Sequence, residues 1–157
     1  MRDKRFVAEH RGGLLTFDDH RRLMKWALAM TEHLQTYLPQ PIDPLLNDAL
    51  IVGKLWSEGL VGTGEAIRQS RAVHKYAQTV EDPAFKLFCR AVGQAVATAH
   101  MADHCLGPVY YGRKLMNLLA LDAEQELAWQ TEKLGEVCPN LHLFILQVMQ
   151  EILQNRK

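Results

Sequence analysis

Two histidines and an aspartate lie close together in Phe85–Lys114, the most apolar long segment of the chain. His100 and His104 are four residues apart, and Asp103 is three residues from His100. If one α-helix carries them, side chains four positions apart lie on the same face. Two imidazoles at this spacing can chelate zinc or another transition metal. This group is therefore the first candidate for a metal, binding or catalytic site.

A catalytic metal site would need a third protein ligand and usually a general base. His74, on the inward side of an earlier predicted helix, is the candidate third ligand, but the sequence HMADH lacks the glutamate of the HExxH motif. The alternative is structural: hydrogen-bonded histidines at the edge of the core, one of them oriented by Asp103. We predict no enzymatic activity and no cofactor. The binding candidates of this group are His74, His100, Asp103 and His104.

Helices must position these side chains, because apolar residues recur at helical spacing along most of the chain. The alternation of apolar and polar residues that marks a half-buried strand is missing from the sequence. Capping side chains and prolines indicate where helices start, since the first helical turn leaves backbone N–H groups without partners. The predicted start signals are Thr16 with Asp19, Asp43-Pro44, Thr63, Asp82-Pro83, Asp122 and Pro139-Asn140.

The fourth predicted helix is expected to lie at the centre of the protein. If it runs as one helix over Phe85–Leu106, its apolar arc is wide enough to pack against several neighbours. Gly93 and Ala97 lie near one edge of this arc, where they would let another helix approach closely beside His100. Gly107-Pro108 is predicted to end the helix.

About seven helices with short connections predict an all-α fold. We expect a single domain over residues 1–157, built as a helical bundle or as stacked helical hairpins around the central apolar helix. A chain of this length can bury a sizeable core. Residues 1–15 are expected to form a mobile or loosely packed lead-in.

The amino-acid composition of the chain limits the classes of partner that it is expected to bind. The chain has 18 Lys and Arg against 18 Asp and Glu, whereas proteins that bind nucleic acid or anionic membranes usually carry a basic excess. We therefore predict neither partner. The sequence holds no apolar run long enough to span a membrane, and the charged start is unlike a secretory signal. Three scattered cysteines favour free thiols and a cytoplasmic location, and self-association stays open.

The tryptophans and one acidic helix face are candidate contact residues. Trp26 and Trp56 are expected in the core, whereas Trp129 lies near the edge of an apolar face and is expected to be partly exposed. The predicted outer face of the sixth helix is a solvated surface or a docking surface for a basic partner, such as a nuclease. Lys133 is the only base near its four acidic residues, Asp122, Glu126, Glu132 and Glu136.

Most of the chain resembles the all-helical immunity proteins of bacterial polymorphic toxin systems. The central segment is the most specific part of the resemblance, and the others are weak when taken singly. Tyr76 departs from the family pattern, in which that position is often small or basic. The segments that carry the resemblance are DDHRRLMKWALAM (18–30), LWSEGLVGTGEAIRQSRAVHKYA with Val73-His74, AVGQAVATAHMADHCLGPVYYGRK, and ELAWQTEKLGE.

The resemblance implies a protein that neutralises a cognate toxin by binding it. The residues themselves leave a second hypothesis open: a helical protein, such as a hydrolase, that binds a metal or a small ligand through His74, His100 and His104. For the first hypothesis, the candidate contact residues on the sixth helix are Trp129, Glu132 and Glu136. Zero net charge argues against mimicry of nucleic acid by the whole molecule, so charge complementarity would be confined to a patch.

Overall fold

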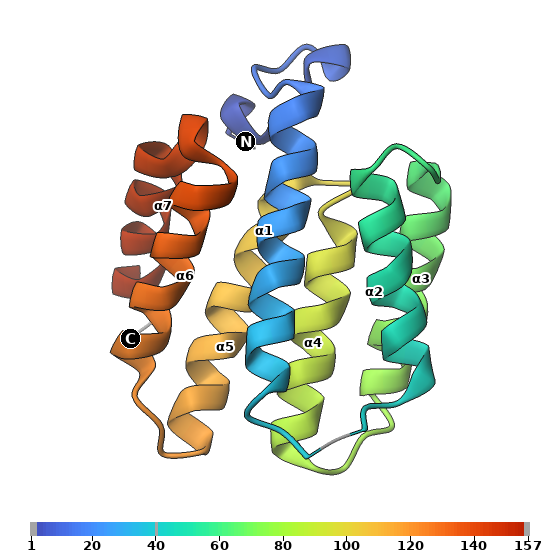
Figure 1. The fold of residues 1–157 in the computed structure, drawn as a ribbon, viewed down its shortest axis with the longest axis vertical. Helices are drawn as coiled ribbons and strands as arrows, with labels where there is room; N and C mark the ends of the chain where they lie inside the picture. The colour runs from blue at the N-terminus through green and yellow to red at the C-terminus, as the bar shows by residue number, and fades with distance from the viewer. Residues whose placement is uncertain (1–2, 40, 156–157) are drawn as a thin grey trace.

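The computed structural model describes residues 3–39 and 41–155, and these form seven α-helices, four short 3-10 helices and no strand (Figure 1). The predicted all-α class is confirmed. None of the helices in these two ranges is long and apolar enough to cross a membrane. The helices are α1 (Phe17–Gln35), α2 (Pro44–Ser57), α3 (Thr63–Ala77), α4 (Pro83–Ala97), α5 (Gly107–Leu118), α6 (Ala123–Val137) and α7 (His142–Asn155).

Four predicted start signals are confirmed as helix caps. In each, a side-chain oxygen accepts a hydrogen bond of 2.8–3.1 Å from a backbone N–H two or three residues later. These bonds satisfy N–H groups that the first turn of a helix leaves without an intrahelical partner. The capping residues are Thr16 for α1, Asp43 for α2, Asp82 for α4 and Asp122 for α6.

Helix α4 lies at the centre, as predicted, and packs against α1, α2, α3 and α5 (Figure 1). Its fully buried residues come from several sides of the helix, because it has neighbours in several directions. Phe88 and Val92 pack in a cluster with α2, α3 and α5, whereas Ala95 packs in a second cluster with α1, α6 and α7. A helix with so wide an apolar arc requires several partners to cover it.

The predicted extent of the central helix is wrong. Helix α4 ends at Ala97, a 3-10 helix follows over Ala102–Leu106, and Gly107-Pro108 begins α5 instead of stopping a helix. Proline is tolerated in the first turn of a helix, because no intrahelical acceptor exists there for its missing N–H. At the end of α4, the carbonyl of Thr98 accepts a hydrogen bond of 2.6 Å from the ring of His20, on α1. A contact from another helix thus accompanies the break.

The part of the expected lead-in that the structure describes, residues 3–15, packs against the bundle. Phe6 and Leu15 are buried among side chains of α1, α6 and α7. The segment folds back on itself, since Leu15 N–H donates to the Val7 carbonyl and Glu9 N–H donates to the Leu15 carbonyl. This segment therefore forms part of the core at the end of the molecule where α1 begins. Residues 1–2 of the lead-in lie outside the described residues.

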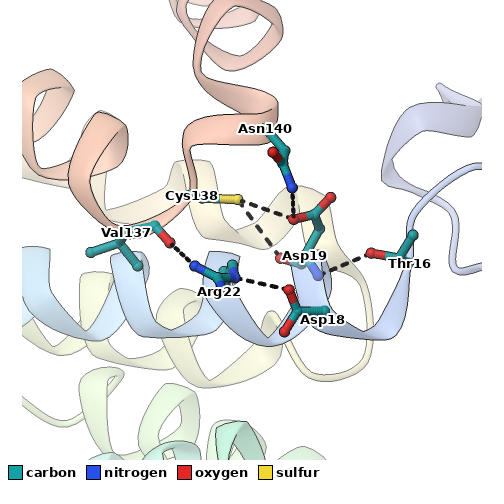
Figure 2. A network of polar contacts seen from close by, with 7 residues as sticks. All are labelled: Thr16, Asp18, Asp19, Arg22, Val137, Cys138 and Asn140. Carbon is teal, nitrogen blue, oxygen red and sulfur yellow. Dashed lines mark hydrogen bonds and ion pairs between the residues drawn. The ribbon is translucent and has the colours of Figure 1, made fainter.

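A polar network joins the start of α1 to the connection between α6 and α7 (Figure 2). Asn140 Nδ2 donates to Asp19 Oδ1 over 3.3 Å, and the Cys138 thiol lies 4.0 Å from the same carboxylate oxygen. Arg22 pairs with Asp18 and donates to the Val137 carbonyl over 3.3 Å. The first and last parts of the chain are thus tied together at one end of the bundle.

Candidate functional site

The histidine group predicted from the sequence is divided in the structure. His100 is exposed and follows the last turn of α4, whereas His104 lies in the 3-10 helix, so the prediction of one shared helix face is wrong. The two residues line different cavities. Within residues 3–39 and 41–155, no three His, Cys, Asp or Glu side chains are grouped so that they could hold a metal ion. The predicted ligand set His74, His100 and His104 is therefore not assembled.

His74 and His104 lie near each other and make polar contacts with α4. The Nδ1–H of His104 donates to Gln94 Oε1 over 2.7 Å, and Arg90 donates to Nδ1 of His74 over 3.1 Å. Burial lowers the pKa of His74, and repulsion from Arg90 and His104 lowers it further. His74 is thus a neutral acceptor in the α3–α4 contact.

Gly93 makes this contact possible. A Cβ atom at Gly93 would lie 2.6 Å from Cε1 of His74, which is closer than real contacts allow. The Ser70 hydroxyl also donates to the Gly93 carbonyl over 2.9 Å. The predicted close approach beside a small residue is confirmed here, but it is His74 of α3 that fits against the glycine. Asp103 lines a cavity of about 320 Å³ together with His104 and Tyr110, so these two members of the predicted group stay together while His100 lines another cavity.

A second cavity, of about 250 Å³, lies at the end of the bundle where α1 begins and where α2 and α4 end. We call it the end pocket. Its walls come from the N-terminal segment, α1, the α2–α3 region and the residues after α4 (Figure 1). The polar and aromatic side chains that line it are Phe6, His10, Arg11, Phe17, His20, Trp56, Thr63 and His100.

Hydrogen bonding and ring packing fix the wall of the end pocket. His20 is buried, and its Nε2–H donates to the Thr98 carbonyl, which leaves Nδ1 as the acceptor of the neutral ring. Its ring packs edge-on against Trp56 at 4.8 Å between centroids. The indole N–H of Trp56 donates to Thr63 Oγ1 over 3.1 Å. The side chains of His20 and Trp56 in this wall are therefore buried or half-buried, and both have defined hydrogen-bond partners.

The mouth of the end pocket is more exposed. The rings of His10 and Phe17 stack in parallel, with centroids 5.2 Å apart. Arg11 directs one guanidinium nitrogen to the Met101 thioether, 3.6 Å away, which is a weak acceptor. Of these pocket residues, only His100 is among the sites predicted from the sequence, and His10, Arg11 and His20 are not. Nothing in their spacing indicates that the fold brings them to one cavity.

Glu126 is a further residue whose environment the sequence analysis missed. It was expected on the exposed acidic face of α6, and this prediction is wrong, because the residue is only 3% exposed. Its carboxylate accepts hydrogen bonds of 2.9 Å from His33 Nδ1 and from the Tyr37 hydroxyl. Burial and this carboxylate raise the pKa of Tyr37 to about 12. The ring of His33 stacks on Trp129 at 3.7 Å, which leaves Trp129 partly exposed, as expected.

The remaining residues of the predicted acidic face form a small surface. Glu132 and Glu136 are exposed, and Lys133 pairs with Glu136 over 3.4 Å. Asp122 is occupied as the cap of α6. The acidic face thus loses only Glu126 of its four expected members, because Asp122 is exposed while it caps the helix, and the role of this face in docking stays a prediction. Of the other tryptophans, Trp26 is fully buried, as expected, whereas Trp56 is only partly buried.

Residues 13–137 match the family described as "Imm-5 like putative immunity protein". The chain belongs to this family. The match confirms the resemblance seen in the sequence and covers α1 to α6. No curated protein and no solved structure matches the chain. The matched range includes His20, Trp56 and His100 of the end pocket, whereas His10 and Arg11 precede it.

Proposed function

We propose that the protein is an immunity protein that binds a cognate bacterial toxin in the cytoplasm and neutralises it by covering a functional surface. The observation that carries this proposal is the family match over residues 13–137, which spans six of the seven helices of the described part of the chain. The proposal includes a toxin from a polymorphic toxin system and no catalytic step of the immunity protein's own.

The physical character of the molecule supports a binding role. Stable protein–protein interfaces bury about 1,600 Å² in total and depend on a few aromatic or arginine anchors in partly enclosed sites. The surface offers such groups at the end pocket, where Phe17 is 50% exposed and Arg11 is exposed. The equal numbers of acidic and basic residues argue that the toxin is recognised by a local patch.

Co-expression tests the proposal. The probe is the C-terminal domain of the toxin encoded by the adjacent upstream gene, induced in a bacterium that carries this protein on a second plasmid. We expect growth to be restored, and we expect the two purified proteins to elute together in gel filtration.

A variant with a charged side chain in the core provides the control. Met30 is fully buried in α1, so Met30→Asp should unfold the protein and abolish the rescue. If the wild-type protein is well expressed and folded but neither restores growth nor forms a complex with this toxin domain, the proposed pairing is wrong.

A further inference from the structure

The end pocket holds the positive charge of Arg11, which no acidic side chain in its described lining offsets. Arg11 and three histidines contribute to its lining, and no aspartate or glutamate is among the lining residues that the structure describes. The three histidines come from positions far apart in the sequence, namely 10, 20 and 100. In a molecule whose formal net charge is zero, a lining with one arginine and no described acidic residue is a local excess of positive charge.

The groups around the pocket are close enough to influence one another. Burial is the main cause of the lowered pKa of His20, and repulsion from His10 and Arg11 lowers it further. Ion pairs or carboxylates that would offset this repulsion are not among the pocket's described lining residues. An anion entering the pocket would reverse the unfavourable interaction, and the aromatic walls would strengthen the attraction by excluding water.

Large apolar side chains are exposed at the end of the bundle that holds the pocket. Phe17, which lines the pocket, is 50% exposed, and Leu14 and Leu60 are 70% and 68% exposed. The N-terminal segment and the α2–α3 connection, which carry Leu14 and Leu60, lie at this same end (Figure 1). Exposed apolar side chains next to a polar pocket are a feature of surfaces that partner proteins cover.

We infer that the end pocket receives an aspartate or glutamate side chain of the toxin, and that the exposed ring of Phe17 beside it packs against the toxin surface. This inference rests on the proposed function. Arg11 can offer two parallel N–H donors to a carboxylate, a far stronger partner than the Met101 thioether that it contacts. His10 and His100 lie beside it as further donors.

A protein carboxylate suits this site better than a phosphate chain. Proteins that bind nucleic acid neutralise several successive phosphates with a row of basic side chains, whereas this pocket holds one arginine and no lysine among its described lining residues. Its volume of about 250 Å³ is small, and the exposed ring of Phe17 lies in its lining. Both features favour a single side chain presented by a folded partner.

The affinity for the upstream toxin domain, measured by biolayer interferometry, tests this inference. Arg11→Glu and His100→Glu change exposed residues of the pocket, so the fold should persist, which circular dichroism would verify. We expect each variant to weaken binding by at least tenfold. Lys75→Glu, which changes net charge as Arg11→Glu does but lies on the exposed side of α3, should alter affinity by less than twofold.

The acidic surface of α6 is the rival docking site, and the same experiment includes it. Glu132→Lys and Glu136→Lys should leave the affinity nearly unchanged if the end pocket is the contact. If these two variants weaken binding while Arg11→Glu and His100→Glu do not, the inference is overturned and α6 is the contact surface. A toxin domain that binds neither the wild type nor any variant contradicts the proposed function itself.

Two further measurements separate a carboxylate from other anions. A toxin variant with one interfacial Asp or Glu changed to Arg should restore binding to Arg11→Glu, because the charges are then exchanged. A 12-nucleotide single-stranded DNA should not bind the wild-type protein at physiological salt. Micromolar binding of that DNA that disappears in Arg11→Glu would overturn the inference in favour of a nucleic acid.

Discussion

Gly93 shows how one missing side chain positions a neighbouring helix. The ring of His74 occupies the space where a Cβ atom would lie. We expect Gly93→Ala to lower the free energy of unfolding by about 1–3 kcal/mol, because overpacking of a tight contact outweighs the better helix propensity of alanine. Urea unfolding followed by circular dichroism measures the change.

Gly64 provides the matched control. It also lies in a helix, α3, but it is exposed, and a Cβ atom there would meet only the end of Arg68, 3.9 Å away. Gly64→Ala should therefore raise the free energy of unfolding, by up to about 1 kcal/mol. If both variants stabilise the protein equally, the contact between Gly93 and His74 does not constrain the fold.

One buried and one partly buried histidine make stability depend on pH. The pKa values of His20 and His74 are both lowered, mainly by burial, and repulsion from His10 and Arg11 at His20, and from Arg90 and His104 at His74, adds to the effect. Below the ordinary histidine value of 6.5, the unfolded chain binds protons that the folded protein does not. The free energy of unfolding should therefore fall as the pH drops from 6.5 toward the lowered values.

Urea unfolding at pH 7.5, 6.5 and 5.5 tests this dependence. Each histidine contributes a slope of at most about 1.4 kcal/mol per pH unit, so His20→Gln or His74→Gln should flatten the wild-type slope by up to that amount. A slope that is unchanged in both variants would contradict the assignment of neutral, buried rings.

At the scale of elements, Asp43 joins two helices. Its Oδ1 caps α2 by accepting from Leu45 N–H over 2.8 Å, and its Oδ2 accepts from the Tyr76 hydroxyl of α3 over 3.1 Å. The tyrosine that departs from the family pattern in the sequence thus has a structural partner. Asp82, by comparison, caps α4 and is exposed.

We expect Asp43→Ala to destabilise the protein more than Asp82→Ala. Loss of a cap alone costs about 0.5–2 kcal/mol, and the lost hydrogen bond to Tyr76 adds about 0.5–1.5 kcal/mol. Tyr76→Phe should cost only the second amount. Thermal unfolding of the three variants measures these differences. Equal melting temperatures for Asp43→Ala and Asp82→Ala would contradict the predicted role of Asp43 in joining α2 to α3.

The helices and most of their starts could be predicted from the sequence, because caps such as Thr16 and Asp82 act within a few residues. The break after Ala97 could not, since it involves the Thr98 carbonyl and His20, which lies 78 residues away. The same limit applies to the site. His100 was noticed for its neighbours in the sequence, whereas the end pocket depends on residues that only the packed bundle brings together.

For the whole molecule, α1 and α4 connect two hydrophobic clusters. Met24 and Phe88 belong to one cluster, and Trp26 and Ala95 belong to the other. Each of these two helices therefore has buried side chains in both clusters. Because neither cluster can lose α1 or α4 without exposing apolar surface of the other, we expect a single cooperative unfolding transition.

The positions of the three cysteines allow local unfolding of each hydrophobic cluster to be measured from the reactivity of its thiols. All are free and buried, with Cys89 in one cluster and Cys105 and Cys138 in the other. Burial raises the pKa of Cys89 and of Cys138 to about 11, so the folded protein should react slowly with thiol reagents. Peptide mass spectrometry after timed alkylation would give a separate opening rate for each of the two clusters.

If the two hydrophobic clusters open together, all three cysteines should be modified at one rate. Faster modification of Cys89 alone would indicate that the cluster with α2 and α3 opens independently. If the proposed function holds, a toxin that binds the folded protein should slow all three reactions by a factor set by its concentration and dissociation constant. The unlabelled wild-type chain therefore allows toxin affinity to be measured in a cell lysate, with no tag and no substitution at the surface that the toxin contacts.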